Sequence, residues 1–142
     1  MPASLTSVKI QLETQLSELS SLVWSSDALE EAIRAALAEI AGTYGSAVTL
    51  SGLDGAISTT LDDADVHALV IGGVAHAARF RIFGRFEEAT SEEFNPDALI
   101  RWAEAAMAEF QSALTRIRLR RFQESTDHPY SPWDWDEGRA FL

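Results

Sequence analysis

Apolar residues near the start of the chain recur at spacings of three and four, which is the period of an amphipathic helix. This first stripe consists of Leu5, Val8, Leu12, Leu16 and Leu19. Thr6 or Ser7 can cap the helix, because a side-chain hydroxyl accepts hydrogen bonds from amides that the first turn leaves unpaired. The pattern therefore predicts a first helix over residues 4–19.

A second stripe of the same period follows Asp27. It consists of Leu29, Ile33, Leu37, Ile40 and Tyr44. Asp27 and Glu30 have the spacing of a capping box, and Gly42 or Gly45 can end the helix. The pattern predicts a second helix that begins at Asp27 and ends near these glycines.

The segment that comes next changes character. Val48, Leu50 and Ile57 favour strands, and the sequence SGLDG between them is typical of a turn. We expect a short β-hairpin arm at about residues 47–61. An isolated two-stranded hairpin is marginally stable in water, so the arm is expected to lean on a helix or on a neighbouring chain.

A third helix is predicted over residues 63–86, and it is rich in small side chains. Gly72 and Gly73 lie in its middle, where each glycine costs about 0.5–1 kcal/mol relative to alanine. A helix that carries this cost usually lets another backbone approach closely, within one chain or between subunits. We expect leucine at either glycine to clash and alanine to be tolerated.

A fourth and longer helix begins at Pro96, which is favourable in a first turn, and extends to Phe122 or Gln123. Its apolar stripe consists of Leu99, Trp102, Ala106, Phe110, Ala113, Leu114 and Ile117. Together with the second helix it should supply the central core residues, namely Leu37, Ile40, Phe110 and Leu114.

These patterns predict a mainly α fold: a four-helix bundle over residues 1–124, with the β-hairpin arm, and an extended C-terminal tail over residues 125–142. The chain has 142 residues and 46% hydrophobic residues, as expected for one globular domain. It contains no cysteine, which excludes disulfides and thiolate metal sites. We expect neither a signal peptide nor a membrane span, because no apolar run is long enough.

No pattern in the sequence indicates an enzyme, a bound metal or a cofactor. His67 and His76 are nine residues apart, on opposite sides of a helix, so they cannot bind one metal within a chain. We interpret both, and His128, as structural or surface residues. The run DDADVH before the third helix lacks the glycine and distal glutamate of an EF-hand, and acids are ordinary at a helix start.

The formal net charge is −11, which disfavours duplex DNA or RNA as the main partner. The arginines nevertheless gather in two groups. The first group is Arg79, Arg81 and Arg85, and the second is Arg116, Arg118, Arg120 and Arg121. Each group is either a solvated helix end that favours cations or part of a protein interface, where arginine is preferred to lysine.

The tail, HPYSPWDWDEGRAFL, combines aromatic, acidic and proline residues. Its prolines prevent a regular helix or strand, and extended segments of this kind bind grooves on partner proteins. The candidate partner-binding residues are Pro129, Tyr130, Pro132, Trp133, Asp134, Trp135 and Asp136. The alternative is that the tryptophans fold back on their own bundle.

Three stretches of the chain resemble the head-to-tail connector (adaptor, head-completion) proteins of long-tailed bacteriophages. They are VWSSDALEEAIRAALAEIAGTYG, LVIGGVAHAARFRIFGRFEEA, and PDALIRWAEAAMAEFQSALTRIRLRRFQE with the aromatic tail behind it. The likeness lies in the order and spacing of elements. The sparse basic content of this chain is a departure from the family.

The resemblance implies a structural protein of the virion neck, assembled in the host cytoplasm. It implies a homo-oligomeric ring, expected to be twelve-fold, that binds the portal protein through the tail and receives the next neck or tail component. DNA would pass through the lumen without specific binding. In that ring, Gly72, Gly73 and the arginines of the second group would lie at subunit or partner interfaces.

A second class of protein also fits the composition. A small acidic helical binding protein of the immunity or regulatory type would act as a monomer or dimer on a basic partner, because its negative surface would complement that partner. Rings or portal-bound complexes distinguish the connector from this alternative.

Overall fold

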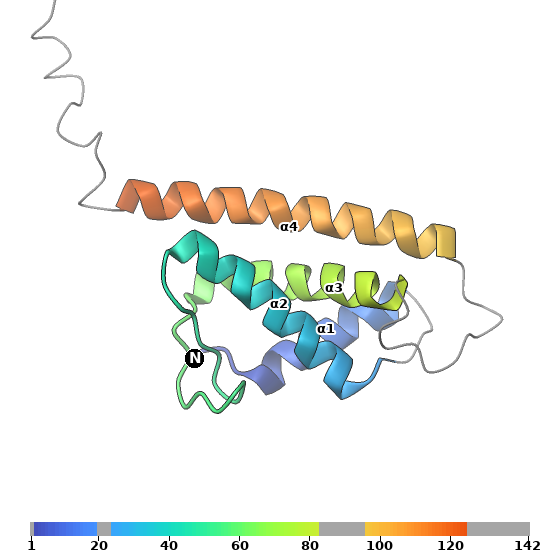
Figure 1. Ribbon diagram of the computed structural model, residues 1–142, viewed down its shortest axis with the longest axis horizontal. Helices are drawn as coiled ribbons and strands as arrows, with labels where there is room; N and C mark the ends of the chain where they lie inside the picture. Colours follow the sequence, from blue (N-terminus) through green and yellow to red (C-terminus); the bar gives the residue numbers. More distant parts are fainter. Residues whose placement is uncertain (1, 20–23, 83–95, 125–142) are drawn as a thin grey trace, which may run out of the picture.

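The computed structural model describes residues 2–19, 24–82 and 96–124 of the chain. Four α-helices and one short 3-10 turn occupy most of these residues (Figure 1). In chain order they are α1 (Leu5–Leu19), α2 (Ser26–Tyr44), η1 (Asp63–Asp65), α3 (Val66–Ile82) and α4 (Pro96–Glu124). The mainly helical fold predicted from the sequence is confirmed.

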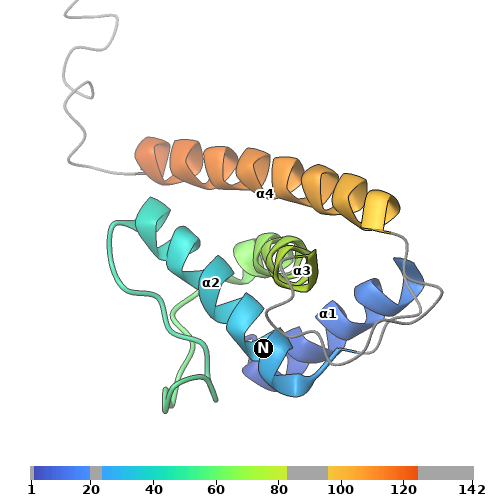
Figure 2. The same ribbon diagram turned by 45° about the vertical axis from the view of Figure 1, so that its right-hand side comes forward.

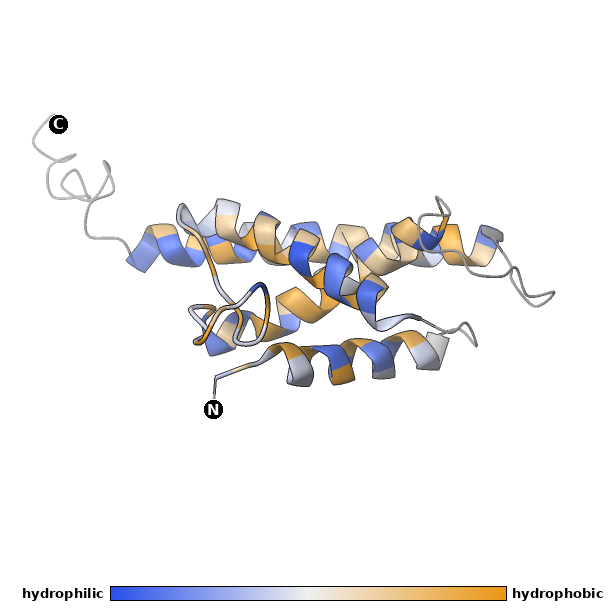
Figure 3. Ribbon diagram, turned by 60° about the horizontal axis from the view of Figure 1, so that its bottom comes forward, coloured by the Kyte–Doolittle hydropathy of each residue, from blue (hydrophilic) through white to orange (hydrophobic). Residues whose placement is uncertain are grey.

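Helix α3 is the centre of the bundle and packs against α1, α2 and α4. Figure 2 shows α3 nearly end-on, with the other three helices around it. In Figure 3, α1 and α4 alternate between hydrophobic and hydrophilic residues, whereas most of α3 is hydrophobic. A helix that is apolar all round belongs in an interior, which explains the small apolar composition of this segment.

The core residues predicted from the second and fourth stripes are all buried. Ile40 and Phe110 have no exposed surface, and Leu37 and Leu114 are each 6% exposed. They belong to one continuous cluster that also includes Leu12 of α1. The helical period in the sequence therefore gave the correct inward faces.

The residues that cap the starts of α1 and α2 differ from the ones that the sequence predicted. The first helix is capped by Ser4: its Oγ accepts from the amide of Ser7 at 3.3 Å, and its own amide donates to Oγ of Ser7 at 3.0 Å. The second helix is capped by Ser25, whose Oγ accepts from the amide of Ala28 at 3.1 Å. In each case a serine that precedes the predicted capping residue accepts the hydrogen bond from a first-turn amide.

The carboxyl end of α2 is as expected. Gly45 has φ 75°, in the left-handed region that glycine adopts without a Cβ penalty, and its amide donates to the carbonyl of Ala41 at 3.0 Å.

Gly72 is a point of very close packing inside the chain. A Cβ added there would lie 2.6 Å from Cε1 of Phe110 and 2.8 Å from Cβ of Ala36. The expectation that alanine is tolerated at this position is therefore wrong. At Gly73 the nearest atom is Cδ2 of Leu12, at 3.2 Å, which is the end of a flexible side chain.

The expected β-hairpin arm at residues 47–61 is not present as paired strands, because these described residues contain only turns and one isolated parallel bridge between Ser4 and Ser51. Threonine hydroxyls take the place of some of the backbone carbonyls that would accept hydrogen bonds between two paired strands. The amide of Thr49 donates to Oγ1 of Thr60 at 2.8 Å, and the amide of Ser51 donates to Oγ1 of Thr59 at 2.9 Å. Short hydroxyl side chains compete with the backbone in this way, so strand propensity did not become a strand.

Candidate functional site

The seven tail residues proposed to bind a partner lie outside the described residues. The structure does describe the point from which the tail begins, because α4 ends at Glu124. The last turn of α4, with the residues that hold it, is therefore the candidate functional site.

A buried carboxylate holds the last turn of α4. Asp65 is 2% exposed and lies at the end of η1, directly before α3. The guanidinium of Arg120 donates two parallel hydrogen bonds to it, at 2.8 Å to Oδ1 and 2.6 Å to Oδ2. Such bidentate, charge-assisted pairs are stronger and more directional than neutral hydrogen bonds. The start of α3 and the end of α4 are thus joined by one ion pair.

Tyr44, the last residue of α2, completes this arrangement. Its hydroxyl donates to Oδ2 of Asp65 and accepts from the amide of Asp62 at 3.1 Å. Burial acts to raise the pKa of Asp65, but the hydrogen bonds from Arg120 and Tyr44 outweigh it and hold that pKa below its ordinary value. Burial, followed by the bond to Asp65, raises the pKa of Tyr44. Three helices are therefore tied together around one ionised carboxylate.

Arg121 covers the same site from outside. Its guanidinium lies 3.9 Å from the centroid of the Tyr44 ring, a cation–π contact, and its Nη1 is 3.5 Å from Oδ2 of Asp62. The Nη2 atom of Arg120 is also 3.6 Å from Oδ2 of Asp62. We call Tyr44, Asp62, Asp65, Arg120 and Arg121 the α4 anchor.

The predicted interface residues therefore separate into two kinds. Arg120 and Arg121 are held within the chain by the α4 anchor, whereas Arg116 and Arg118 are exposed. Gly72 and Gly73 are buried in α3 beneath α1, α2 and α4, so their close packing is served within the chain. Neither glycine lies on a surface that another subunit can reach.

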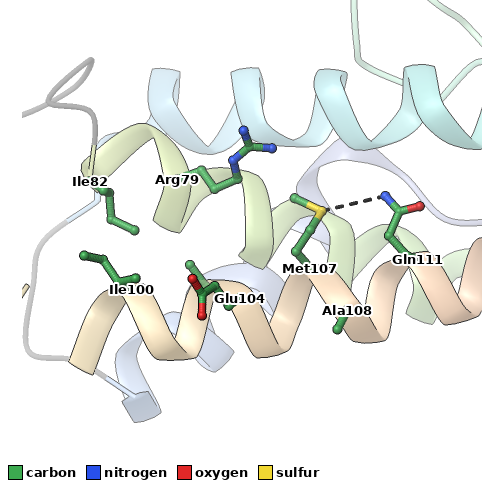
Figure 4. Close-up of a pocket in the computed structure, with 8 residues that line it drawn as sticks. Arg79, Ile82, Ile100, Glu104, Met107, Ala108 and Gln111 are labelled. Atoms are coloured by element: carbon green, nitrogen blue, oxygen red, sulfur yellow. Dashed lines mark hydrogen bonds between the residues drawn. The ribbon is translucent and has the colours of Figure 1, made fainter. Parts of the chain in front are cut away.

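An apolar groove of about 480 Å³ lies between α3 and the first half of α4 (Figure 4). Its lining is Arg79, Ile82, Ile100, Ala103, Glu104, Met107, Ala108 and Gln111. Besides Arg79, Glu104 and Gln111, the lining is apolar. Nε2 of Gln111 lies 3.9 Å from Sδ of Met107. A groove of this size can take large apolar side chains.

The two described histidines differ in their surroundings. His67 is exposed, and Nε2 of His76 lies 2.6 Å from Oε2 of Glu39, joining α3 to α2. Within residues 2–19, 24–82 and 96–124, no three His, Cys, Asp or Glu side chains form a group that could hold a metal ion. No helix in this part of the chain is long and apolar enough to cross a membrane.

In comparisons with protein-family models, with curated proteins and with solved structures, nothing matches this chain.

The α4 anchor was not predicted from the sequence. Asp65 had the appearance of an ordinary acid at a helix start, and Arg120 that of a solvated cation at a helix end. The two residues are far apart in the chain, and periodicity alone does not bring them together. A usable signal was present in Tyr44, an aromatic with a polar tip at the end of an apolar stripe, because a buried tyrosine hydroxyl requires a partner.

Proposed function

We propose that this chain is a head-to-tail connector of a long-tailed bacteriophage, a structural subunit that attaches to the portal protein through its C-terminal tail. The observation that carries this function best is the α4 anchor. Arg121 lies in the last turn of α4 and Arg120 directly before it, so the helix end is fixed by Asp65 and Tyr44 shortly before the aromatic tail begins. A fixed starting point lowers the entropy that a docking segment loses when it binds.

The residue types of the tail suit docking on another protein. Tyr130, Trp133 and Trp135 supply large rings with one polar atom each, and such residues are frequent interface anchors. Asp134 and Asp136 would select a partner surface that carries arginine or lysine.

The net charge of −11 is compatible with a DNA conduit. A channel through which DNA slides must not bind phosphates, and duplex affinity comes mainly from cations that displace counterions. Two of the arginines near the end of α4 are already neutralised by Asp62 and Asp65.

Electron microscopy of the full chain, alone and mixed with portal rings from the same source, tests the connector function. Rings, or portal rings with added density at one end, are the expected result. A chain that neither forms rings nor binds portal rings would contradict the function.

Deletion of residues 126–142 tests the role of the tail. The bundle should keep its melting temperature, because the described residues already form a continuous buried core among themselves, whereas binding to portal rings should be lost. Trp133→Ala and Trp135→Ala should each weaken binding by about 2 kcal/mol or more, the range of interface hot spots. If the deletion instead unfolds the bundle, the tail is part of the core and the docking role is wrong.

The acidic composition also favours the second candidate, a binding protein that inhibits or regulates a basic partner. This candidate predicts a monomer or dimer that binds basic proteins at low salt and loses them as salt screens the charges. Absence of rings, together with such binding, would select it over the connector.

A further inference from the structure

One flank of α4, beside the groove, carries a stripe of residues that are exposed except for Met107, which is partly buried against the core. The stripe consists of Ile100, Glu104, Met107, Gln111, Thr115, Arg118 and Phe122, at spacings of 4, 3, 4, 4, 3 and 4 residues. These spacings are those of one face of a helix. Ile100 is 37% exposed and Phe122 is 42% exposed, and the neighbouring Leu119 is 56% exposed.

The spacings between the residues of the stripe are symmetric about Gln111. Glu104 and Arg118 lie seven residues to each side of it, and Ile100 and Phe122 lie eleven residues to each side. Because Glu104 and Arg118 carry opposite charges at equal distances from Gln111, two copies that meet in opposite directions place each Glu104 opposite an Arg118. That is the requirement for a two-fold interface, in which the same patch is used by both subunits.

We propose that a second copy of this chain binds along this flank of α4, with the two α4 helices antiparallel and the two Gln111 residues opposite each other. In this register Glu104 of each copy faces Arg118 of the other. Neither residue forms an ion pair with any residue of the described ranges, so both charges are available for a partner.

The same register brings the apolar groups together. Leu119 of one copy, which is 56% exposed, reaches the groove of the other, which is lined by Ile82, Ile100 and Met107 (Figure 4). The groove thus has an occupant whose size and polarity fit it, and the contact is made twice because of the two-fold symmetry. The exposed apolar side chains of both copies are removed from water.

This pairing goes beyond the proposed function, because it requires neither a ring nor a portal. A two-fold pair is not a twelve-fold ring, so in a connector it would be the form that exists before assembly on the portal. One helix from each copy makes a small interface, and small interfaces give weak, concentration-dependent association. The expected state is therefore a monomer–dimer equilibrium.

Charge reversal tests the pairing. Glu104→Arg places two cations opposite each other at two sites, and Arg118→Glu places two anions there, so each variant alone should dimerise at least about tenfold more weakly. A mixture of the two variants should associate again, because each copy then meets opposite charges at both sites. Sedimentation equilibrium over a wide range of protein concentration measures the dissociation constants of the unmodified chain, of each variant and of the mixture.

Glu109→Arg and Arg116→Glu are the matched controls. Both residues are exposed on α4, carry the same charges and lie outside the stripe. They should leave the dissociation constant unchanged. A wild-type chain that stays monomeric at every concentration, or controls that weaken association as much as the test variants, would overturn the pairing.

The absence of cysteine allows a direct test of the register. Gln111→Cys should give a covalent dimer on mild oxidation, because in the antiparallel register residue 111 is the one stripe position that faces its own copy. Glu109→Cys should not. Equal crosslinking of both variants would overturn the register. Since no portal is present, a failure here leaves the connector function untouched, and a pair that never binds portal rings supports the pairing alone.

Discussion

The ring of Phe110 in α4 occupies the space that any side chain on Gly72 in α3 would need. An added Cβ would lie 2.6 Å from Cε1 and 2.7 Å from Cζ of the ring, and Ala36 of α2 closes the other side at 2.8 Å. Three helices therefore meet at one glycine, and the position of α4 on the bundle depends on it.

Gly72→Ala should destabilise the fold, although alanine is the better helix former by about 1 kcal/mol. Overpacking of a closed site costs about 1–3 kcal/mol, and here the obstacle is an aromatic ring together with a Cβ. Chemical denaturation of the variant measures the loss.

Gly73→Ala is the control for this change. The nearest atom there is the tip of Leu12, at 3.2 Å, which can move by rotation, so the change in free energy of unfolding should stay within about 1 kcal/mol of zero. Equal stabilities for the two alanine variants would contradict the packing at Gly72.

Arg120→Ala should remove the main partner of a buried carboxylate. Loss of one member of a buried ion pair costs about 3–5 kcal/mol, and the lower end of this range applies because the Arg120 side chain is 32% exposed and water can partly replace it. Arg116→Ala, an exposed residue of the same helix outside the proposed pairing surface, should change the free energy of unfolding by less than about 0.5 kcal/mol. Similar losses in the two variants would show that the ion pair does not hold α4.

The α4 anchor should also make stability depend on acid pH. The pKa of Asp65 is held below its unfolded value of about 3.9, so its contribution is present above that pH and is lost as the pH falls through the folded pKa. In urea titrations from neutral to acid pH, Asp65→Asn should be less stable at neutral pH and should lose less stability on acidification than the unmodified chain.

Asp54→Asn is the matched comparison for the pH experiment. The pKa of Asp54 is lowered by its hydrogen bond to Arg34, but this pair is exposed to solvent. Its substitution should leave the acid slope close to that of the unmodified chain, because exposed ion pairs contribute little. If the two variants respond alike, the buried carboxylate is not the source of the slope.

The chain should not bind duplex DNA appreciably at physiological salt, because a net charge of −11 repels a polyanion and Arg120 and Arg121 are already paired. Fluorescence anisotropy with a labelled duplex measures this. Submicromolar binding with a steep dependence on salt would identify a basic face around Arg116 and Arg118.

The sequence predicted what depends on helical period and missed what depends on side chains meeting across the fold. Leu37 and Phe110 were placed in the core correctly, because a stripe of period 3.6 identifies the inward face before any partner is known. The Asp65–Arg120 pair was missed, because its members look like ordinary helix-end charges until the helices are packed. The clash at Gly72 was missed for the same reason, since smallness indicates close packing without identifying the neighbour.

The threonines of the loop between α2 and η1 have a consequence for solubility. A segment rich in residues such as Val48 and Ile57 is prone to add strands from other molecules, and open amides on an edge invite that addition. Here the amides of Thr49 and Ser51 are taken by the hydroxyls of Thr60 and Thr59. The hydroxyls of Thr59 and Thr60 thus close these two donors to an incoming strand, so replacement of both threonines by alanine should make the chain more prone to aggregate.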